Sequence, residues 1–261
     1  MKTMQNPRII TALFCLFIIF GCFTGCESYL FDESTADSAP QSNSIQVDIT
    51  APEEKTTSPA EYDPFDDAVF VGDSVTLKLS YYCEEYPEAL GGAQFFCAGS
   101  LGYTNSLWEL DHEDAVHPFY RGETCLSSDC AAITGAHNVF IMLGINDIDL
   151  YGLDESLQSA ETLVAQIRAK SPGVSIYIQS VTPVFFGKET GELTNENIRL
   201  FNDMLRGLCE KSDCKYLDIY GLLADGDGYL PSEYCGDQEA QGIHFTDAAC
   251  ELWVKYLREN V

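Results

Sequence analysis

Two short motifs near opposite ends of the chain carry the residues of a possible acyl-transfer site. A Gly-Asp-Ser sequence at 72–74 follows an apolar β-forming run, and a Gly-Ile-His-Phe-Thr sequence at 242–246 precedes the last amphipathic stretch. A serine hydroxyl becomes a nucleophile when a neighbouring base takes its proton. Alone, Ser74 would be a helix N-cap and His244 a structural histidine. The two motifs together make Ser74 and His244 candidates for a nucleophile and its base.

The elements that must position these residues follow from hydrophobic periodicity. Short β-branched or aromatic runs alternate with amphipathic stretches, which indicates an α/β fold with a parallel sheet covered by helices on both faces. A last helix is expected from about 247 to 257, with Thr246 as its N-cap. The expected strands lie at 68–71, 94–97, 138–143, 175–178 and 215–218.

Ligands of open parallel sheets bind beyond the carboxyl ends of the strands. Three motifs lie at such ends: Gly-Asp-Ser at 72–74, Gly-Ser-Leu-Gly at 99–102 and Gly-Ile-Asn-Asp at 144–147. We therefore expect these three loops to meet at one edge of the sheet.

The motifs, in this order along the chain, resemble those of the SGNH, or GDSL-type, hydrolase family. The resemblance covers about Asp67 to Leu257 and includes the Ser-Val-Thr-Pro segment at 180–183 and the helix containing Asn202. It implies a three-layer α/β/α, flavodoxin-like domain with a five-stranded parallel sheet, and a serine esterase as the activity. No metal and no cofactor are expected.

Carried over residue by residue, the family pattern makes Ser74 the nucleophile and His244 the general base. It gives the oxyanion hole three donors: the backbone N–H groups of Ser74 and Gly102, and the side-chain amide of Asn146. Each preorganised donor of this kind lowers the barrier by ~2.7–4 kcal/mol. Gly102 alone would be an ordinary turn glycine.

The third member of the triad departs from the family pattern. The acid normally stands three residues before the histidine, and that position here is Gln241. Three outcomes are open: Gln241 accepts the imidazole N–H through its amide oxygen, Asp237 or Glu239 replaces the acid, or the enzyme is impaired. In serine proteases the change from acid to amide costs ~10⁴ in rate. We favour a working Ser-His pair with neutral or displaced support.

The N-terminal region predicts export and lipid anchoring. Lys2 and Arg8 precede an apolar run at 9–23, and the Phe-Thr-Gly-Cys sequence at 23–26 resembles a bacterial lipobox. We expect a signal peptide at 1–25, lipidated Cys26 on the outer face of the cell membrane, a flexible acidic tether at 26–62 and the catalytic domain at 63–261. The alternatives are an uncleaved N-terminal helix and a plain secretory signal with an incidental Cys26.

The formal net charge of −27 argues against nucleic acid as a partner and against direct docking on anionic lipid. Membrane contact is expected only through the lipid on Cys26. Eight cysteines remain after those of the signal and Cys26 are set aside, with sequence-local disulfide candidates at 125/130 and 209/214. The Asp-Gly-Asp-Gly sequence at 225–228 is expected to be a turn and not a calcium loop.

The leading functional hypothesis is hydrolysis of small acyl esters, such as O-acetyl groups on extracellular carbohydrate. An O-acyltransferase would use the same acyl-enzyme, with a sugar hydroxyl in place of water. A non-catalytic glycan-binding module is the alternative from another class, motivated by Gln241. A protein that only binds glycan has no chemical need for a nucleophile, a base and oxyanion donors together, which argues against the binding module.

Overall fold

The computed structural model describes residues 63–261 of the chain. The expected signal peptide at 1–25, Cys26 and the tether at 26–62 lie outside these residues. None of the helices within 63–261 is both long and apolar enough to cross a membrane.

Five parallel strands form the central sheet, as the sequence predicts. Their order in space is β2-β1-β5-β6-β7, and every neighbouring pair is parallel. The strand bounds are β1 (Ala68–Gly72), β2 (Gln94–Cys97), β5 (Asn138–Met142), β6 (Ser175–Gln179) and β7 (Lys215–Leu217). β7 ends one residue before the predicted Asp218, because the Asp218 carboxylate accepts the N–H of Gly221 and so begins a short helix.

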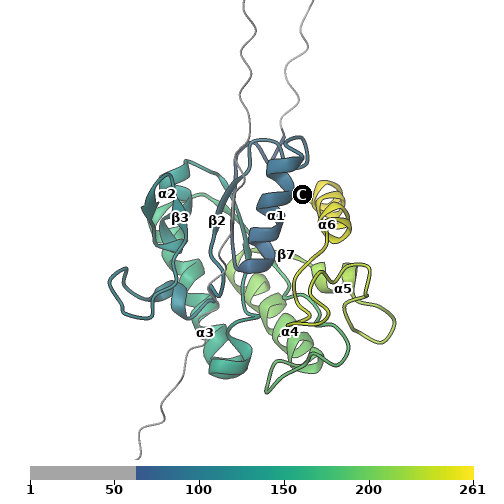
Figure 1. Cartoon of the computed structure of the whole chain (residues 1–261). Helices are drawn as coiled ribbons and strands as arrows, with labels where there is room; N and C mark the ends of the chain where they lie inside the picture. The colour runs from purple at the N-terminus through teal and green to yellow at the C-terminus, as the bar shows by residue number, and fades with distance from the viewer. Residues whose placement is uncertain (1–62) are drawn as a thin grey trace, which may run out of the picture. The chain divides into compact units, whose positions relative to one another are not determined.

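Helices cover both faces of the sheet, which confirms the three-layer α/β/α architecture (Figure 1). One layer contains α1 (Ser74–Glu85), α5 (Ile219–Leu223) and α6 (Asp247–Asn260). The other contains α2 (Cys130–Thr134), α3 (Ile148–Lys170) and α4 (Asn195–Ser212). Thr246 caps α6 as predicted, because its hydroxyl accepts the N–H of Ala249.

Alternate side chains of each strand enter different cores because the side-chain period of a strand is two. In β1, Val69 and Val71 pack toward α3 and α4, whereas Ala68 and Phe70 pack toward α1 and α6. All four are fully buried. Both faces of the strand are therefore apolar, as in sheets that helices cover on both sides.

A row of aromatic rings ties four neighbouring strands together on the α1/α6 face. Phe70 stacks on Phe140 with 4.6 Å between centroids, Phe140 stacks on Tyr177 at 4.5 Å, and Phe95 lies 5.3 Å from Phe70. The strand register places these residues directly opposite one another. At the end of the row the ammonium of Lys215 lies 4.6 Å from the Tyr177 ring centroid. This row holds the strands in register beneath the candidate site.

Short elements lie in the connections between strands. A two-stranded hairpin is formed by β3 (Phe119–Tyr120) and β4 (Glu123–Thr124), and Phe119 stays largely exposed. The 3₁₀ turns are η1 (Asn105–Leu107) and η2 (Ser127–Asp129). η1 is the next element after β2, so the loop that carries Gly102 spans residues 98–104.

All eight cysteines of the described region are free thiols. The sequence-local pairs at 125/130 and 209/214 do not form in this structure. The thiol of Cys125 lies 3.6 Å from the carbonyl oxygen of Glu123, and that of Cys214 lies 3.6 Å from the carbonyl oxygen of Ser212. Each thiol thus contacts a backbone acceptor close to it in the chain.

Candidate active site

Ser74 begins α1 immediately after β1, at the carboxyl edge of the sheet. The Asp73 carboxylate accepts the N–H of Val75 at 2.8 Å and caps the helix. A Cβ atom at Gly72 would lie 2.0 Å from the Thr76 hydroxyl and 3.0 Å from a backbone oxygen of β5, so only glycine allows this turn. The turn leaves Ser74 half-buried at the helix N-terminus, whose free N–H groups favour negative charge.

A hydrogen-bonded chain connects Ser74, His244 and Asp237. Nε2 of His244 lies 2.9 Å from Oγ of Ser74, and Nδ1 of His244 lies 2.7 Å from Oδ2 of Asp237. An ionised carboxylate only accepts hydrogen bonds, so Nδ1 carries the proton and Nε2 accepts the serine hydroxyl. In this tautomer His244 is ready to take the proton of Ser74.

Asp237 reaches His244 because the chain between them forms a tight turn. Its backbone oxygen accepts the N–H groups of Ala240 and Gly242, and its Oδ1 accepts those of Ile243 and His244, both at 3.0 Å. Gly242 has a φ of 69°, a conformation that favours glycine. One carboxylate therefore fixes both the backbone and the ring of the histidine.

Gln241 does not support His244, which corrects one of the possibilities left open by the sequence. Both ring nitrogens of His244 already have partners, so no ring N–H remains for the Gln241 amide oxygen. Gln241 is exposed and lines a neighbouring pocket, and Glu239 is also exposed. The carboxylate that contacts the histidine ring is that of Asp237, which stands seven residues before His244 instead of three.

The electrostatics of Asp237 agree with an ionised partner. Partial burial by itself would raise the pKa of this carboxyl group. The hydrogen bonds from the side chain and backbone of His244 outweigh burial, so the pKa of Asp237 is lowered below its usual value. The carboxylate stays charged at neutral pH and can stabilise a protonated His244.

Asn146 and Gly102 lie at the carboxyl ends of β5 and β2, on either side of the strand that leads to Ser74. Nδ2 of Asn146 donates to the carbonyl oxygen of Leu101 at 3.0 Å. An amide NH₂ group has two hydrogens, so a second one remains for a substrate oxygen. The expected side-chain donor therefore lies beside the loop that carries Gly102.

The backbone N–H of Gly102 already has an acceptor, a feature that the sequence did not reveal. It donates to Oδ1 of Asn105 at 2.7 Å, while Nδ2 of Asn105 donates to the carbonyl oxygen of Ser100 at 2.9 Å. A substrate oxygen that uses the Gly102 N–H must share this hydrogen bond or replace it. The amide side chain at 105, three residues after Gly102, is the only sequence signal for this contact.

Asp147 fixes the Gly102 loop from the β5 side. Its carboxylate accepts the N–H groups of Tyr103 and Thr104 at 2.8 and 2.9 Å. A Cβ atom at Gly102 would lie 2.5 Å from this carboxylate, so glycine is required there. Burial raises the pKa of Asp147, and the two N–H groups partly offset that rise.

Asp73 is a second buried carboxyl group directly beside the nucleophile. Burial raises its pKa from 3.8 to about 7, the nearby charge of Asp147 adds to the rise, and the N–H groups of Val75 and Thr76 oppose it. Asp73 faces the helix N-terminus and makes no contact with His244 in the described hydrogen bonds. Its role is to shape the turn at Ser74.

Two asparagines of α4 fix the segment that follows β6. Asn202 accepts the N–H of Val181 at 2.8 Å and donates to its carbonyl oxygen at 2.9 Å, and Asn195 does the same for Val184. The N–H of Phe185 then donates to the carbonyl oxygen of Gly242 at 2.8 Å. The α4 helix thereby supports the loop that carries His244.

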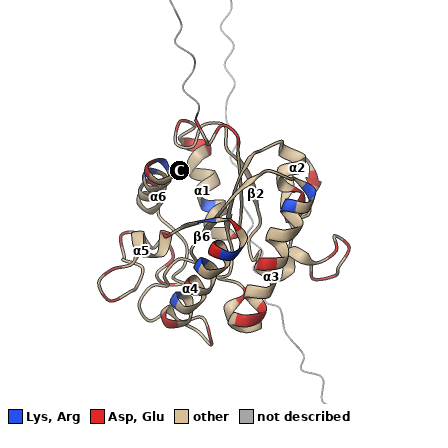
Figure 2. Ribbon diagram, turned by 180° about the vertical axis from the view of Figure 1, so that it is seen from behind, with Lys and Arg blue, Asp and Glu red and all other residues tan. Residues whose placement is uncertain are grey.

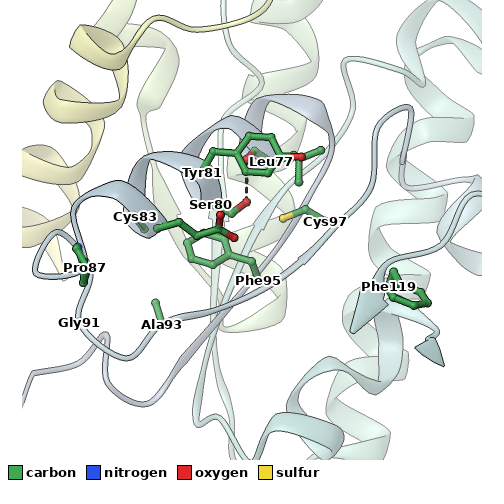
Figure 3. Close-up of a pocket in the computed structure, with 11 residues that line it drawn as sticks. Leu77, Ser80, Tyr81, Cys83, Pro87, Gly91, Ala93, Phe95, Cys97 and Phe119 are labelled. Carbon is green, nitrogen blue, oxygen red and sulfur yellow. Dashed lines mark hydrogen bonds between the residues drawn. The ribbon is translucent and has the colours of Figure 1, made fainter. Parts of the chain in front are cut away.

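Two cavities lie near these elements. One of about 310 Å³ is lined by Asn146 and by residues on both sides of the histidine loop, including Lys188, Gln241 and Ile243. A larger one of about 440 Å³ lies between α1 and β2, where Tyr81 and Phe95 line it (Figure 3). Only the smaller cavity includes a member of the candidate oxyanion hole.

The Asp-Gly-Asp-Gly sequence at 225–228 forms the predicted turn. Oδ1 of Asp225 accepts the N–H groups of Asp227 and Tyr229, both at 2.9 Å. Within residues 63–261, no cluster of three or more His, Cys, Asp or Glu side chains is arranged to hold a metal ion.

A Ser-His-Asp chain at the carboxyl edge of a parallel α/β/α sheet is the arrangement of a serine hydrolase. The chain belongs to the GDSL-like lipase/acylhydrolase family, whose model matches residues 70–252. No protein of curated function matches the sequence.

Solved structures with the same fold come from several bacteria. A GDSL-like lipase from Bacteroides thetaiotaomicron has a TM-score of 0.58 at 14% identity, over 77% of this chain and 90% of that one. A proposed acylhydrolase from Bacteroides fragilis has a TM-score of 0.57 at 15% identity, over 74% and 84% of the two chains. A lipase/acylhydrolase from Enterococcus faecalis has a TM-score of 0.51 at 15% identity, over 74% and 93%. At these identities the likeness concerns the fold.

Proposed function

We propose that this protein hydrolyses small acyl esters through an acyl-enzyme on Ser74, with His244 as general base and Asp237 as its orienting acid. The single observation that carries the proposal is the chain of contacts at 2.9 Å from Ser74 to His244 and 2.7 Å from His244 to Asp237. Such a chain places base and nucleophile within reach for proton transfer. Membership of an acylhydrolase family supports the same reaction class.

In the proposed reaction, Oγ of Ser74 attacks the ester carbonyl carbon while its proton passes to Nε2 of His244. The tetrahedral intermediate collapses, the alcohol leaves with the proton from Nε2, and the acyl group stays on Ser74. Water then attacks the acyl-enzyme and gives its proton to the same nitrogen. The carboxylic acid leaves, and Ser74 recovers its hydrogen.

Three groups are assigned as hydrogen-bond donors to the oxyanion of both tetrahedral intermediates: the N–H of Ser74, the N–H of Gly102 and the side-chain amide of Asn146. The positions of these groups at the ends of three adjacent strands support the assignment. Asn105 is the present acceptor of the Gly102 N–H, so the third donor is gained when the substrate oxygen takes the place of that acceptor. Each donor lowers the barrier by ~2.7–4 kcal/mol.

For the substrate we propose O-acetyl or similarly short acyl esters on extracellular carbohydrate. The cavity of about 310 Å³ beside Asn146 is at the small end of the range for ligand sites, which favours a short acyl group on a sugar over a long lipid chain. The lipobox-like sequence before Cys26 supports a place on the outer face of the cell membrane.

The test is a substrate screen with the soluble domain that begins near residue 63. We expect hydrolysis of nitrophenyl acetate and of acetylated sugars, and loss of both activities in Ser74→Ala and His244→Ala. Activity on long-chain esters alone would overturn the substrate proposal. Acetylated products that form only with an added sugar acceptor would indicate the acyltransferase, and sugar binding without any turnover would indicate the binding module.

A further inference from the structure

The cavity beside Asn146 contains one charged side chain, Lys188, in an otherwise neutral lining. Ile145, Leu193 and Ile243 provide apolar surface, and the remaining lining residues are the uncharged Asn146, Gly187, Thr190, Ala240 and Gln241. A cation with no acid in the same lining favours an anionic group on whatever enters this cavity.

The local fold fixes the stem of Lys188 against the histidine loop. Its N–H donates to the carbonyl oxygen of Phe185 at 3.0 Å, and Gly187 between them has a φ of 76°, which closes a tight turn. A Cβ atom at Gly242 would lie 2.6 Å from Cγ of Lys188. The missing side chain of Gly242 therefore leaves room for the aliphatic stem, two residues before His244.

The carboxylates near Lys188 have other partners. Oε1 of Glu189 accepts the N–H of Asn195 at 2.6 Å, and Oδ1 of Asp149 accepts the N–H of Glu192 at 2.6 Å. Asp237 is held by His244. These acids are thus turned toward donors of the protein, and none of the ion pairs in the described region includes Lys188.

Four of the other basic side chains of the domain are held in ion pairs. The cations paired with a carboxylate in the described region are Lys78, Lys170, Arg206 and Arg258. Figure 2 shows that basic segments are few and that acidic segments occur on loops on several sides. Lys188 is among the basic side chains of the described region that have no ion pair, and it is the one that lines the cavity beside Asn146.

The larger cavity between α1 and β2 provides a contrast within the same molecule. Its only charged lining residue is Glu84, and Tyr81, Phe95 and Phe119 supply aromatic surface (Figure 3). An anionic ligand would be repelled there by Glu84. The two cavities therefore differ in the sign of their charge.

We propose that Lys188 selects esters of acidic sugars, with the ammonium paired to the carboxylate of the sugar that bears the acyl group. This inference rests on the proposed function, because it names the alcohol that the same Ser74 site releases. The apolar lining then contacts the C–H face of the ring, and Thr190 and Gln241 are placed for its hydroxyl groups. No electron transfer or further co-reactant is involved, since the step is the ester hydrolysis already described.

The experiment compares two matched substrates, an O-acetylated methyl glucuronate and the corresponding O-acetylated methyl glucoside. We expect the protein to prefer the acidic sugar in kcat/KM by about tenfold, the size of one partly exposed charge-assisted hydrogen bond. The preference should disappear in Lys188→Gln, persist in part in Lys188→Arg, and weaken at high salt. The matched control is Lys255→Gln, which changes an exposed lysine on α6 and should keep the preference.

Two further readouts separate this inference from the proposed function. Hydrolysis of nitrophenyl acetate, which carries no carboxylate, should be the same in Lys188→Gln and in the unchanged protein. Equilibrium binding of the two sugars to Ser74→Ala reports carboxylate recognition without turnover. Equal kcat/KM and equal binding for both sugars, or a Lys188→Gln variant that loses all substrates alike, would overturn the inference. If the protein does not hydrolyse nitrophenyl acetate but still binds the acidic sugar through Lys188, the proposed function is overturned and the inference about Lys188 stands.

Discussion

Replacing Asp237 by asparagine tests the reassigned acid with little change in shape. Oδ1 of Asp237 accepts two backbone N–H groups at 3.0 Å, so an asparagine would keep its carbonyl oxygen there. Its NH₂ group would then take the place of Oδ2, 2.7 Å from Nδ1 of His244. Because NH₂ donates, Nδ1 would have to accept and the ring proton would move to Nε2, where it faces Ser74. The general base would be lost.

The expected magnitude follows from the same substitution in a serine protease triad, where turnover falls ~10⁴-fold. This fall corresponds to about 5 kcal/mol of barrier. We expect Asp237→Asn to lower kcat for nitrophenyl acetate by ~10³–10⁴ with a small change in KM, since the residue does not line the cavity beside Asn146.

Matched controls are available in the same loop. Gln241→Ala and Glu239→Ala alter exposed side chains near Asp237. Both should keep the turnover of nitrophenyl acetate, which offers no sugar hydroxyl to Gln241, within about twofold. Circular dichroism and thermal melting would establish that each variant is folded. A kcat of Asp237→Asn within tenfold of the unchanged protein, or a large loss in Gln241→Ala, would refute the assignment of Asp237.

Three further predictions concern the residues that shape the site. Asp73 has a pKa of about 7 in the folded state against 3.8 ordinarily, so the folded state binds the proton more tightly than the unfolded chain. The free energy of unfolding should therefore fall as the pH rises from about 4 to 7, by about 4 kcal/mol at most. Urea unfolding at both pH values should show this fall, and Asp73→Asn should remove it; an unchanged pH dependence in the variant would count against the buried acid. Asn105→Ala frees the N–H of Gly102, so kcat should stay the same or rise, and a hundredfold fall would mean that Asn105 is itself needed. Asn202→Ala leaves the N–H and C=O of Val181 without their partners and should lower the free energy of unfolding by about 2–4 kcal/mol, measured by urea titration; a loss below about 0.5 kcal/mol would contradict this reading.

The fold could be predicted because its signals are local and repeated. The apolar run of β1 is buried on both faces, and the polar residues Asp73 and Ser74 that end it mark the turn and the helix start. The same logic located the ends of β2 and β5, and hence the loops carrying Gly102 and Asn146. Periodicity carries this information because burial alternates with the period of the element.

The partner of His244 could not be chosen from the sequence. Asp237, Glu239 and Gln241 all lie within seven residues of the histidine, and the family pattern puts the acid at position 241, where a glutamine stands. The deciding factor is the turn closed by Gly242, which folds Asp237 back onto the ring. Such a turn depends on tertiary hydrogen bonds, including the one from Phe185 to Gly242, that no local pattern reveals.

The contacts of Asn105 and Lys188 escaped prediction for a related reason. Asn105 belongs to none of the motifs, and its effect depends on the side chain bending back to the N–H of Gly102. Lys188 is one of 14 basic residues, and only the packing of its stem over Gly242 brings it beside Asn146. Charge counts describe the whole chain, whereas recognition depends on where each charge lies relative to the cavity.

The most direct test of the central claim is intact-mass labelling of the soluble domain with a fluorophosphonate, which reacts with an activated serine. We expect one label per chain, lost in Ser74→Ala, strongly slowed in His244→Ala and Asp237→Asn, and unaffected in Gln241→Ala. This result would establish that Ser74 is activated through the hydrogen bonds to His244 and Asp237. A folded protein that takes no label, or one whose label persists in Ser74→Ala, would contradict the account.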